Sequence, residues 1–198
     1  AWGTFVGINA AVKHKLGRSD LEGLNVAIQG IGNVGYRLAR HLKEAGAKLW
    51  VYDVHQDQMD RAVAELGATP ASADEILYLP VDVVAPCAMG AVLNDHSIRK
   101  LQATIVAGAA NNQLATQAHD QALFERGVLY APDFVINAGG IIDVCYERKG
   151  PDPQAVRKHV DSIANTLEEI FQRSDRDGLP TGQIADQLAE ERFRHKSR

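Results

Sequence analysis

The sequence lacks the features that mark secreted, membrane-spanning and nucleic-acid-binding proteins. Two cysteines among 198 residues, Cys87 and Cys145, are too few for a disulfide scaffold in a chain of this size and do not have metal-ligand spacing. No apolar run approaches the roughly 20 residues that cross a bilayer. A net charge of −4 and a charged fraction of 23% argue against a nucleic-acid surface and against disorder. We therefore expect a cytoplasmic protein with no membrane anchor and no nucleic-acid partner.

An initiator methionine and the basic start of a signal peptide are also missing, because the sequence opens with Ala1-Trp2-Gly3-Thr4. We expect that it begins partway through a longer protein. Its seven histidines include no pair at metal-ligand spacing, so no metal site is expected. His41, His119 and His159 fall on predicted helices and are expected to face solvent.

What the sequence does contain is an apolar strand that runs into a glycine-rich turn. Residues 26–29 are followed by Gly30-Ile31-Gly32-Asn33-Val34-Gly35, with the spacing Gly-x-Gly-x-x-Gly. Gly30 allows a tight turn, Gly32 has no Cβ to block phosphates, and Gly35 lets the next helix lie close to the strand. The free N–H groups and the positive end of the helix dipole would face an anion, so the turn predicts a pyrophosphate site.

The residues around this turn strengthen the prediction. Apolar residues at helical spacing follow Gly35, and a second strand at residues 49–52 ends at Asp53, 18 residues after Gly35. A carboxylate at that distance binds the adenosine ribose hydroxyls of NAD and repels the 2′-phosphate of NADP. The competing interpretations are an ordinary strand-to-helix turn for the glycines and a strand-end turn residue for Asp53.

Short apolar strands alternate with helical patterns along most of the chain. The predicted strands are residues 25–29, 48–52, 81–85, 104–107 and 128–130. The predicted helices are residues 5–16, 33–45, 58–66, 95–101 with Asn94 or Asp95 as its cap, 118–126, 139–148, 155–175 and a last helix carrying Ile184, Leu188 and Ala189. Ser72 and Glu75 predict a capping box for one more short helix. Residues 134–136 are expected to extend the sheet or to form a turn beside it.

This alternation predicts an α/β protein with a Rossmann-type, doubly wound, mostly parallel sheet and additional C-terminal helices. We expect residues 1–198 to form one dinucleotide-binding domain. Within it, residues 1–17 are a connecting helix, residues 18–150 are the Rossmann core, and residues 151–198 are the C-terminal helices.

Four segments that occur in one order carry a family resemblance. They are the glycine turn, Pro86-Cys87-Ala88-Met89-Gly90-Ala91-Val92-Leu93, Ala107-Gly108-Ala109-Ala110-Asn111-Asn112-Gln113-Leu114, and residues 130–140, which end in Asn137-Ala138-Gly139-Gly140. Together they resemble the NAD-binding half of the glutamate/leucine/phenylalanine/valine dehydrogenases. Within that family, the leucine dehydrogenases resemble the chain most. The resemblance extends over essentially the whole sequence.

The resemblance implies reversible oxidative deamination of an L-amino acid to a 2-oxo acid with NAD, in an enzyme that is a homo-oligomer. In this family the catalytic lysines lie in glycine-rich loops of a preceding N-terminal domain, which we expect this chain to lack. The lysines at positions 13, 15, 43 and 48 fall on predicted helix surfaces or at a strand start, so we assign them no catalytic role. We expect the chain to bind NAD and, alone, to be inactive.

The predicted cofactor site combines the turn, the second strand end and two loops at the carboxyl edge of the sheet. Its residues are Gly30, Ile31, Gly32, Asn33, Val34, Gly35, Asp53, Val54, Cys87, Ala88, Met89, Ala107, Gly108 and Asn111. The resemblance gives the loop at Cys87 a cofactor-lining role only, and no activating partner for a nucleophilic thiol is apparent. Asn111 is favoured over Asn112 for the cofactor contact, although the sequence does not separate the two, and a capped turn is the alternative for both.

The predicted substrate pocket consists of Asn112, Ile141 and Val144. Ile141 and Val144 are three residues apart on one helix and so share a face. Neither side chain could pair with the γ-carboxylate of a glutamate substrate, and an unpaired buried carboxylate is costly. The pair therefore favours a branched-chain aliphatic amino acid over glutamate. Plain core packing is the alternative for this pair. A non-catalytic NAD-binding module and a phenylalanine- or valine-preferring dehydrogenase remain the alternative functions.

Overall fold

A parallel sheet forms the centre of the structure, a computed structural model that describes residues 1–140, 142 and 152–196. In the described part the sheet has six strands in the order β3-β2-β1-β4-β5-β6, and every neighbouring pair is parallel. The strands are β1 (Asn25–Gln29), β2 (Lys48–Tyr52), β3 (Thr69–Pro70), β4 (Val83–Pro86), β5 (Ile105–Val106) and β6 (Leu129–Tyr130). The chain reverses its direction across the sheet between β1 and β4, which makes the carboxyl ends of these strands the topological switch point.

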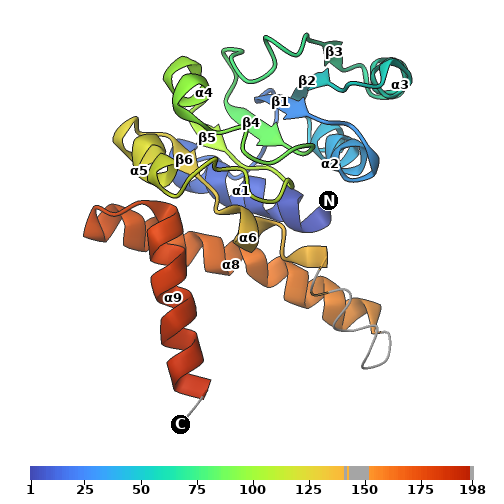
Figure 1. Cartoon of the computed structure of the whole chain (residues 1–198). Coiled ribbons are helices and arrows are strands. Elements are labelled where there is room, and N and C mark those ends of the chain that lie inside the picture. Colours follow the sequence, from blue (N-terminus) through green and yellow to red (C-terminus); the bar gives the residue numbers. More distant parts are fainter. Residues whose placement is uncertain (141, 143–151, 197–198) are drawn as a thin grey trace.

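Helices cover both faces of this sheet (Figure 1). They include α1 (Trp2–Leu16), α2 (Asn33–Glu44), α3 (Gln56–Leu66), α4 (Asp95–Lys100) and α5 (Ala118–Glu125). Alternate residues of one strand face opposite layers: Val26 and Ile28 pack in the cluster with α1 and α2, whereas Ala27 packs in the cluster with α4 and α5. The predicted doubly wound α/β fold is therefore confirmed.

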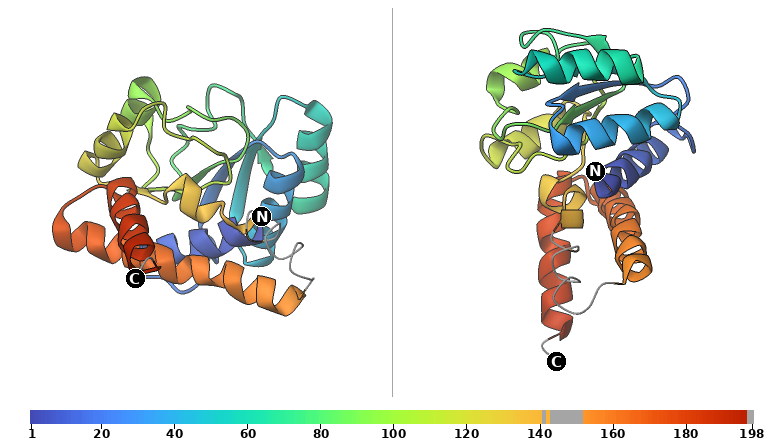
Figure 2. Two further views of the ribbon diagram at one scale, coloured as in Figure 1. Left: turned by 60° about the horizontal axis from the view of Figure 1, so that its bottom comes forward. Right: turned by 90° about the vertical axis from the view of Figure 1, so that its right-hand side faces the viewer.

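The C-terminal helices extend one of these layers. The long helix α8 (Pro153–Asp177) lies along α1 and ends at Gly178, whose φ of 65° is left-handed. Its apolar residues Val160, Ile163, Leu167, Ile170 and Phe171 are buried, and Leu167 and Phe171 belong to the same cluster as Val26 of the sheet. The last helix, α9 (Thr181–Lys196), packs through its first half and projects away from the sheet (Figures 1 and 2). Among the described residues, no helix has the length and apolarity required to cross a bilayer.

Two predictions of secondary structure were wrong, and one strand was missed. Ser72 donates its N–H to the Glu75 carboxylate, which is one half of a capping box, but its hydroxyl also donates to Glu75 instead of accepting from the Glu75 N–H. Only turns follow, because Pro80 stops the chain before a helix can propagate. Residues 134–136 form neither strand nor simple turn but the short helix α6 (Asp133–Ile136). The edge strand β3 was not predicted, because two exposed residues carry no readable pattern. The predicted helix at residues 139–148 lies mostly outside the described residues.

His119 is a further correction, because it is buried rather than facing solvent. Its Nδ1 lies 3.0 Å from the backbone N of Thr116, and its Nε2 lies 3.1 Å from Asp95 Oδ1. These polar partners come from two elements, so the imidazole can be buried without losing its hydrogen bonds. In α9, Ile184 and Leu188 are buried, but Ala189, which was named with them, is exposed. Ala185 is buried in its place.

The shared core predicts that α8 is essential for stability. Phe171→Ala should lower the free energy of unfolding by about 3–5 kcal/mol, because it leaves a cavity in a fully buried position. The matched control is Phe193→Ala on α9, where the side chain is 74% exposed and the expected change is about 0.5 kcal/mol or less. Urea denaturation of both variants measures the difference. Equal effects would contradict the packing of α8 against the sheet layer.

Candidate functional site

The glycine turn connects β1 to α2 at the carboxyl edge of the sheet. Gly30 has a φ of 94°, and a Cβ built on it would lie 2.5 Å from Ala88 Cβ. A Cβ on Gly35 would collide with the carbonyl oxygen of Gly30. A Cβ on Gly32 would meet nothing within 4 Å. Two glycines thus serve close packing of the turn against itself and the β4 loop, while Gly32 borders open space.

The beginning of α2 offers free backbone donors beside that open space. Gly32 is the N-cap, and no side chain caps the helix. The first N–H groups of any α-helix have no acceptor within the helix, and the helix dipole makes this end electropositive. Such an end attracts an anion, and side chains do not fill the turn at Gly32.

Asp53 is bound directly to the glycine turn, although 22 residues separate it from Ile31. Its Oδ2 accepts a hydrogen bond from the backbone N–H of Ile31 at 2.7 Å, and its Oδ1 accepts one from the N–H of His55 at 2.9 Å. A carboxylate oxygen can accept more than one hydrogen bond, so both oxygens keep acceptor capacity. The half-buried Asp53 therefore fixes the turn and can still receive a donor from a ligand.

Three of the predicted site residues are large apolar side chains exposed along this edge. Val34 is 44% exposed, Val54 is 76% exposed and Met89 is 72% exposed. Single exposed apolar residues are ordinary, but these three follow the carboxyl ends of β1, β2 and β4. Each is therefore an exposed apolar side chain that follows a strand end at the carboxyl edge of the sheet.

Some predicted site residues are too buried to present a side chain. Ile31 and Ala107 are fully buried in the core. A Cβ on Gly108 would lie 2.5 Å from the nitrogen of Pro86, so this glycine permits close contact between the ends of β4 and β5. Cys87 is partly buried, and burial raises the pKa of its thiol to about 11. The thiol is therefore protonated at neutral pH, which agrees with a lining role rather than a nucleophilic one.

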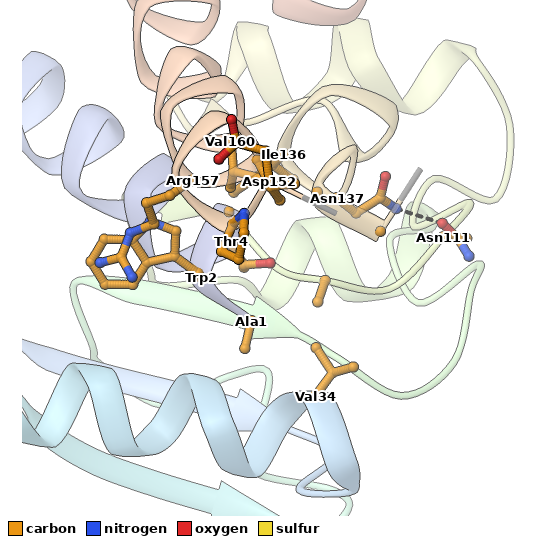
Figure 3. A pocket seen from close by; sticks show the side chains of 16 residues that line it. Ala1, Trp2, Thr4, Val34, Asn111, Ile136, Asn137, Asp152, Arg157 and Val160 are labelled. Atoms are coloured by element: carbon orange, nitrogen blue, oxygen red, sulfur yellow. Dashed lines mark hydrogen bonds between the residues drawn. The ribbon is translucent and has the colours of Figure 1, made fainter. Parts of the chain in front are cut away.

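A cavity of about 650 Å³ lies beside the start of α2 (Figure 3). Val34 and Asn111 line it, and Asn112 is not among its lining residues. Much of its wall is formed by α1, α6 and the first turns of α8, including Ile136, Val156 and Val160. Trp2 and Arg157 lie at one end, where the guanidinium carbon stands 3.6 Å from the centre of the indole ring.

Sequence reasoning missed one residue of this cavity that contacts Asn111. Asn137 follows α6, lines the cavity and donates its Nδ2 to Asn111 Oδ1 (Figure 3). Its place in the segment Asn137-Ala138-Gly139-Gly140 was the available signal. The predicted substrate-pocket residues Ile141 and Val144 lie outside the described residues. Their neighbours Gly139 and Gly140 line the cavity.

Comparison with known proteins identifies the family. Residues 49–174 match the sequence profile of the Glutamate/Leucine/Phenylalanine/Valine dehydrogenase family. The chain belongs to this family. The resemblance predicted from the four motifs is thereby confirmed, as is the nearness to leucine dehydrogenases.

Three members of the family illustrate the extent of the similarity. Leucine dehydrogenase of Bacillus subtilis (strain 168) is 44% identical over 198 residues, which are 100% of this chain and 54% of that protein. Valine dehydrogenase of Streptomyces virginiae is 39% identical over 98% of this chain and 55% of that protein. The crystal structure of L-tryptophan dehydrogenase from Nostoc punctiforme matches with a TM-score of 0.96 and 46% identity, covering 98% of this chain and 59% of that chain. The chain thus spans about half the length of the curated relatives it matches.

The geometry of this dehydrogenase-family turn predicts different costs for two alanine substitutions. Gly30→Ala should destabilise the fold by at least about 2 kcal/mol, because it combines a left-handed φ with a collision at Ala88. Gly32→Ala should change stability by less than about 1 kcal/mol, since its φ is −65° and its Cβ position is open. Thermal and urea denaturation compare the two. A reversed order would show that the turn is packed differently.

Proposed function

We propose that this chain is the NAD-binding part of an L-amino-acid dehydrogenase that deaminates branched-chain amino acids to 2-oxo acids. The observation that carries the proposal is the hydrogen bond from Ile31 N–H to Asp53 Oδ2, beside a helix start that no side chain caps. This contact joins a site for phosphates to a site for ribose hydroxyls. The names of the leucine and valine dehydrogenase relatives support the reaction type.

The residues at this edge fit a dinucleotide. The open space at Gly32 and the uncapped start of α2 suit the pyrophosphate, whose oxygens would accept from backbone N–H groups. Asp53 would accept from the hydroxyls of the adenosine ribose and repel a 2′-phosphate. Val54 and Met89 would lie against the rings or the riboses, and Asn111 would hold the nicotinamide end at the cavity. When bound, NAD supplies the acceptor for a hydride from the substrate.

The base for this reaction is proposed to lie outside this chain. The lysines at positions 13, 15, 43 and 48 are all exposed. Lys13 forms an ion pair with Glu168 at 3.0 Å, and Lys15 donates to the carbonyl oxygen of Gly127 at 2.7 Å. The described residues of the chain would then bind and orient the reactants and help exclude water from the cavity.

A branched-chain substrate is proposed because the cavity next to Asn111 has an aliphatic wall. Ile136, Val156 and Val160 line it. A substrate side chain that lies against these three residues is favoured when it is aliphatic, because a carboxylate there would lose its hydration. Arg157, which also lines the cavity, lies over the Trp2 ring at one end. A phenylalanine- or valine-preferring enzyme would share this wall. One methylene more or less in the substrate changes its transition-state binding free energy by only ~1–3 kcal/mol.

Substitution of Asp53 tests cofactor binding. Asp53→Ala should weaken NAD binding roughly tenfold or more, because a hydrogen bond to a charged group contributes ~1.5–3 kcal/mol. The unaltered chain should bind NADP more weakly than NAD, and Asp53→Asn should narrow that difference by removing the negative charge. Titration calorimetry with both dinucleotides measures these affinities.

The matched control for Asp53 is Asp57→Ala, which removes one negative charge from the exposed first turn of α3. It should leave both affinities within about twofold, since the Asp57 carboxyl lies near the surface where its field is screened. An unchanged NAD affinity in Asp53→Ala, or equal NAD and NADP affinities in the unaltered chain, would remove Asp53 from the site.

Turnover measurements test the reaction and the substrate. The protein encoded by the whole reading frame should produce NADH from leucine, isoleucine and valine faster than from phenylalanine, tryptophan or glutamate. The 198-residue chain alone should bind NAD and produce no NADH with any of them. Absence of turnover in the whole protein would favour the non-catalytic NAD-binding module, whereas turnover by this chain alone would place the base within it.

A further inference from the structure

Gln113 is a fully buried polar side chain in the loop between β5 and α5. It is 0% exposed, and its Nε2 donates to the carbonyl oxygens of Gly108 and Ala110, each at 3.0 Å. Its Oε1 has no hydrogen-bond partner within the described part of the chain. The side chain thus folds back into its own loop and binds the backbone at Gly108 and Ala110, just before Asn111.

The backbone of Gln113 anchors the same loop to two neighbours. Its N–H donates to Asp133 Oδ2 of α6 at 2.8 Å, and its carbonyl oxygen accepts from the N–H of Leu93 at 3.0 Å. Asp133 is held in turn by donating its own N–H to the hydroxyl oxygen of Tyr130 at 3.2 Å. Hydrogen bonds therefore join the loop that carries Gln113 to α6, which lines the cavity, and to the loop that follows β4.

These ties hold a strained conformation. Asn112 has a φ of 51°, in the left-handed region that residues other than glycine seldom adopt. Its carbonyl oxygen accepts from the N–H of Ala91, which itself has a φ of 58°. Such backbone strain persists only where the surrounding contacts determine the conformation, and it is concentrated at functional sites.

The consequence of this geometry is the fixed position of Asn111. Its Oδ1 accepts from Asn137 Nδ2, so the Nδ2 of the same carboxamide is the group that can donate to a ligand (Figure 3). α6 and the residue that follows it hold the second half of the loop, through Asp133 at Gln113 and through Asn137 at Asn111. The Gln113 side chain holds the first half, at Gly108 and Ala110, and loss of its two bonds would release that half.

We propose that Gln113 is a positioning residue, whose two hydrogen bonds inside the 108–113 loop fix Asn111 for the nicotinamide half of the dinucleotide. This inference rests on the proposed function. Gln113 acts through Asn111 and does not face the ligand itself. Its removal should therefore affect ligands that carry a nicotinamide and spare ligands that lack one.

Paired titrations of the chain with NADH and ADP-ribose test this proposal. ADP-ribose keeps the adenosine, both phosphates and the second ribose but lacks the nicotinamide. Gln113→Leu, which removes both donors at similar volume, should weaken NADH roughly fivefold, about the contribution of one hydrogen bond. Its affinity for ADP-ribose should stay within about twofold, because ADP-ribose lacks the nicotinamide that Asn111 is proposed to contact. The fluorescence change of bound NADH should decrease, because the nicotinamide is less well held.

Two further variants separate positioning from general destabilisation. Asn111→Ala should reproduce the NADH effect, and the double variant should lose little more, because both act through one contact. Gln117→Leu is the matched control: Gln117 is exposed at the N-cap of α5 without a side-chain cap bond, so neither affinity should change. If Gln113→Leu does not fold, Gln113→Met keeps the length and flexibility of the side chain and carries the same test.

The outcomes are distinguishable. Equal weakening of NADH and ADP-ribose, no weakening of either, or equal affinity of the unaltered chain for both ligands would overturn the positioning role of Gln113. Failure of the unaltered chain to bind either ligand would instead overturn the proposed function. Additive losses in the double variant would show that Gln113 and Asn111 act separately and would also contradict the inference.

Discussion

The hydrogen bond between the backbone N–H of Ile31 and the carboxylate of Asp53 is the contact on which the rest of the site depends. It connects the ends of β1 and β2, so the glycine turn and the acid cannot move independently. Gly30 and Gly35 complete the constraint, because any side chain on either would collide with neighbouring atoms. The start of α2 is consequently fixed next to open space at Gly32, with its donors free of side-chain caps.

The other parts of the site lie beside the glycine turn along the carboxyl edge of the sheet. The loops after β4 and β5 are bonded to each other through Ala91, Leu93 and their partners at Asn112 and Gln113. α6 then joins the second loop to the cavity that α1 and α8 enclose. Both C-terminal helices therefore share a core cluster with the sheet, and α8 also forms part of the cavity wall.

Local patterns made most of the fold predictable from the sequence. The glycine spacing and the apolar patterns of the strands and helices depend on neighbouring residues, and most of the predicted elements were found close to their expected positions. Contacts between distant residues were not predictable. The bond of Asp53 to Ile31, the burial of His119 and the pairing of Asn111 with Asn137 need the folded chain. Gln113 belongs to the motif at residues 107–114, but only its burial in the folded chain indicates that it positions Asn111.

A crystal structure of the chain with bound NAD tests the central claim most directly. The account predicts pyrophosphate oxygens within ~2.7–3.2 Å of backbone nitrogens at residues 32–34, with a ribose hydroxyl at a similar distance from the Asp53 carboxylate. A dinucleotide bound elsewhere, or one whose phosphates avoid the glycine turn while Asp53 remains bonded only to Ile31 and His55, would contradict it.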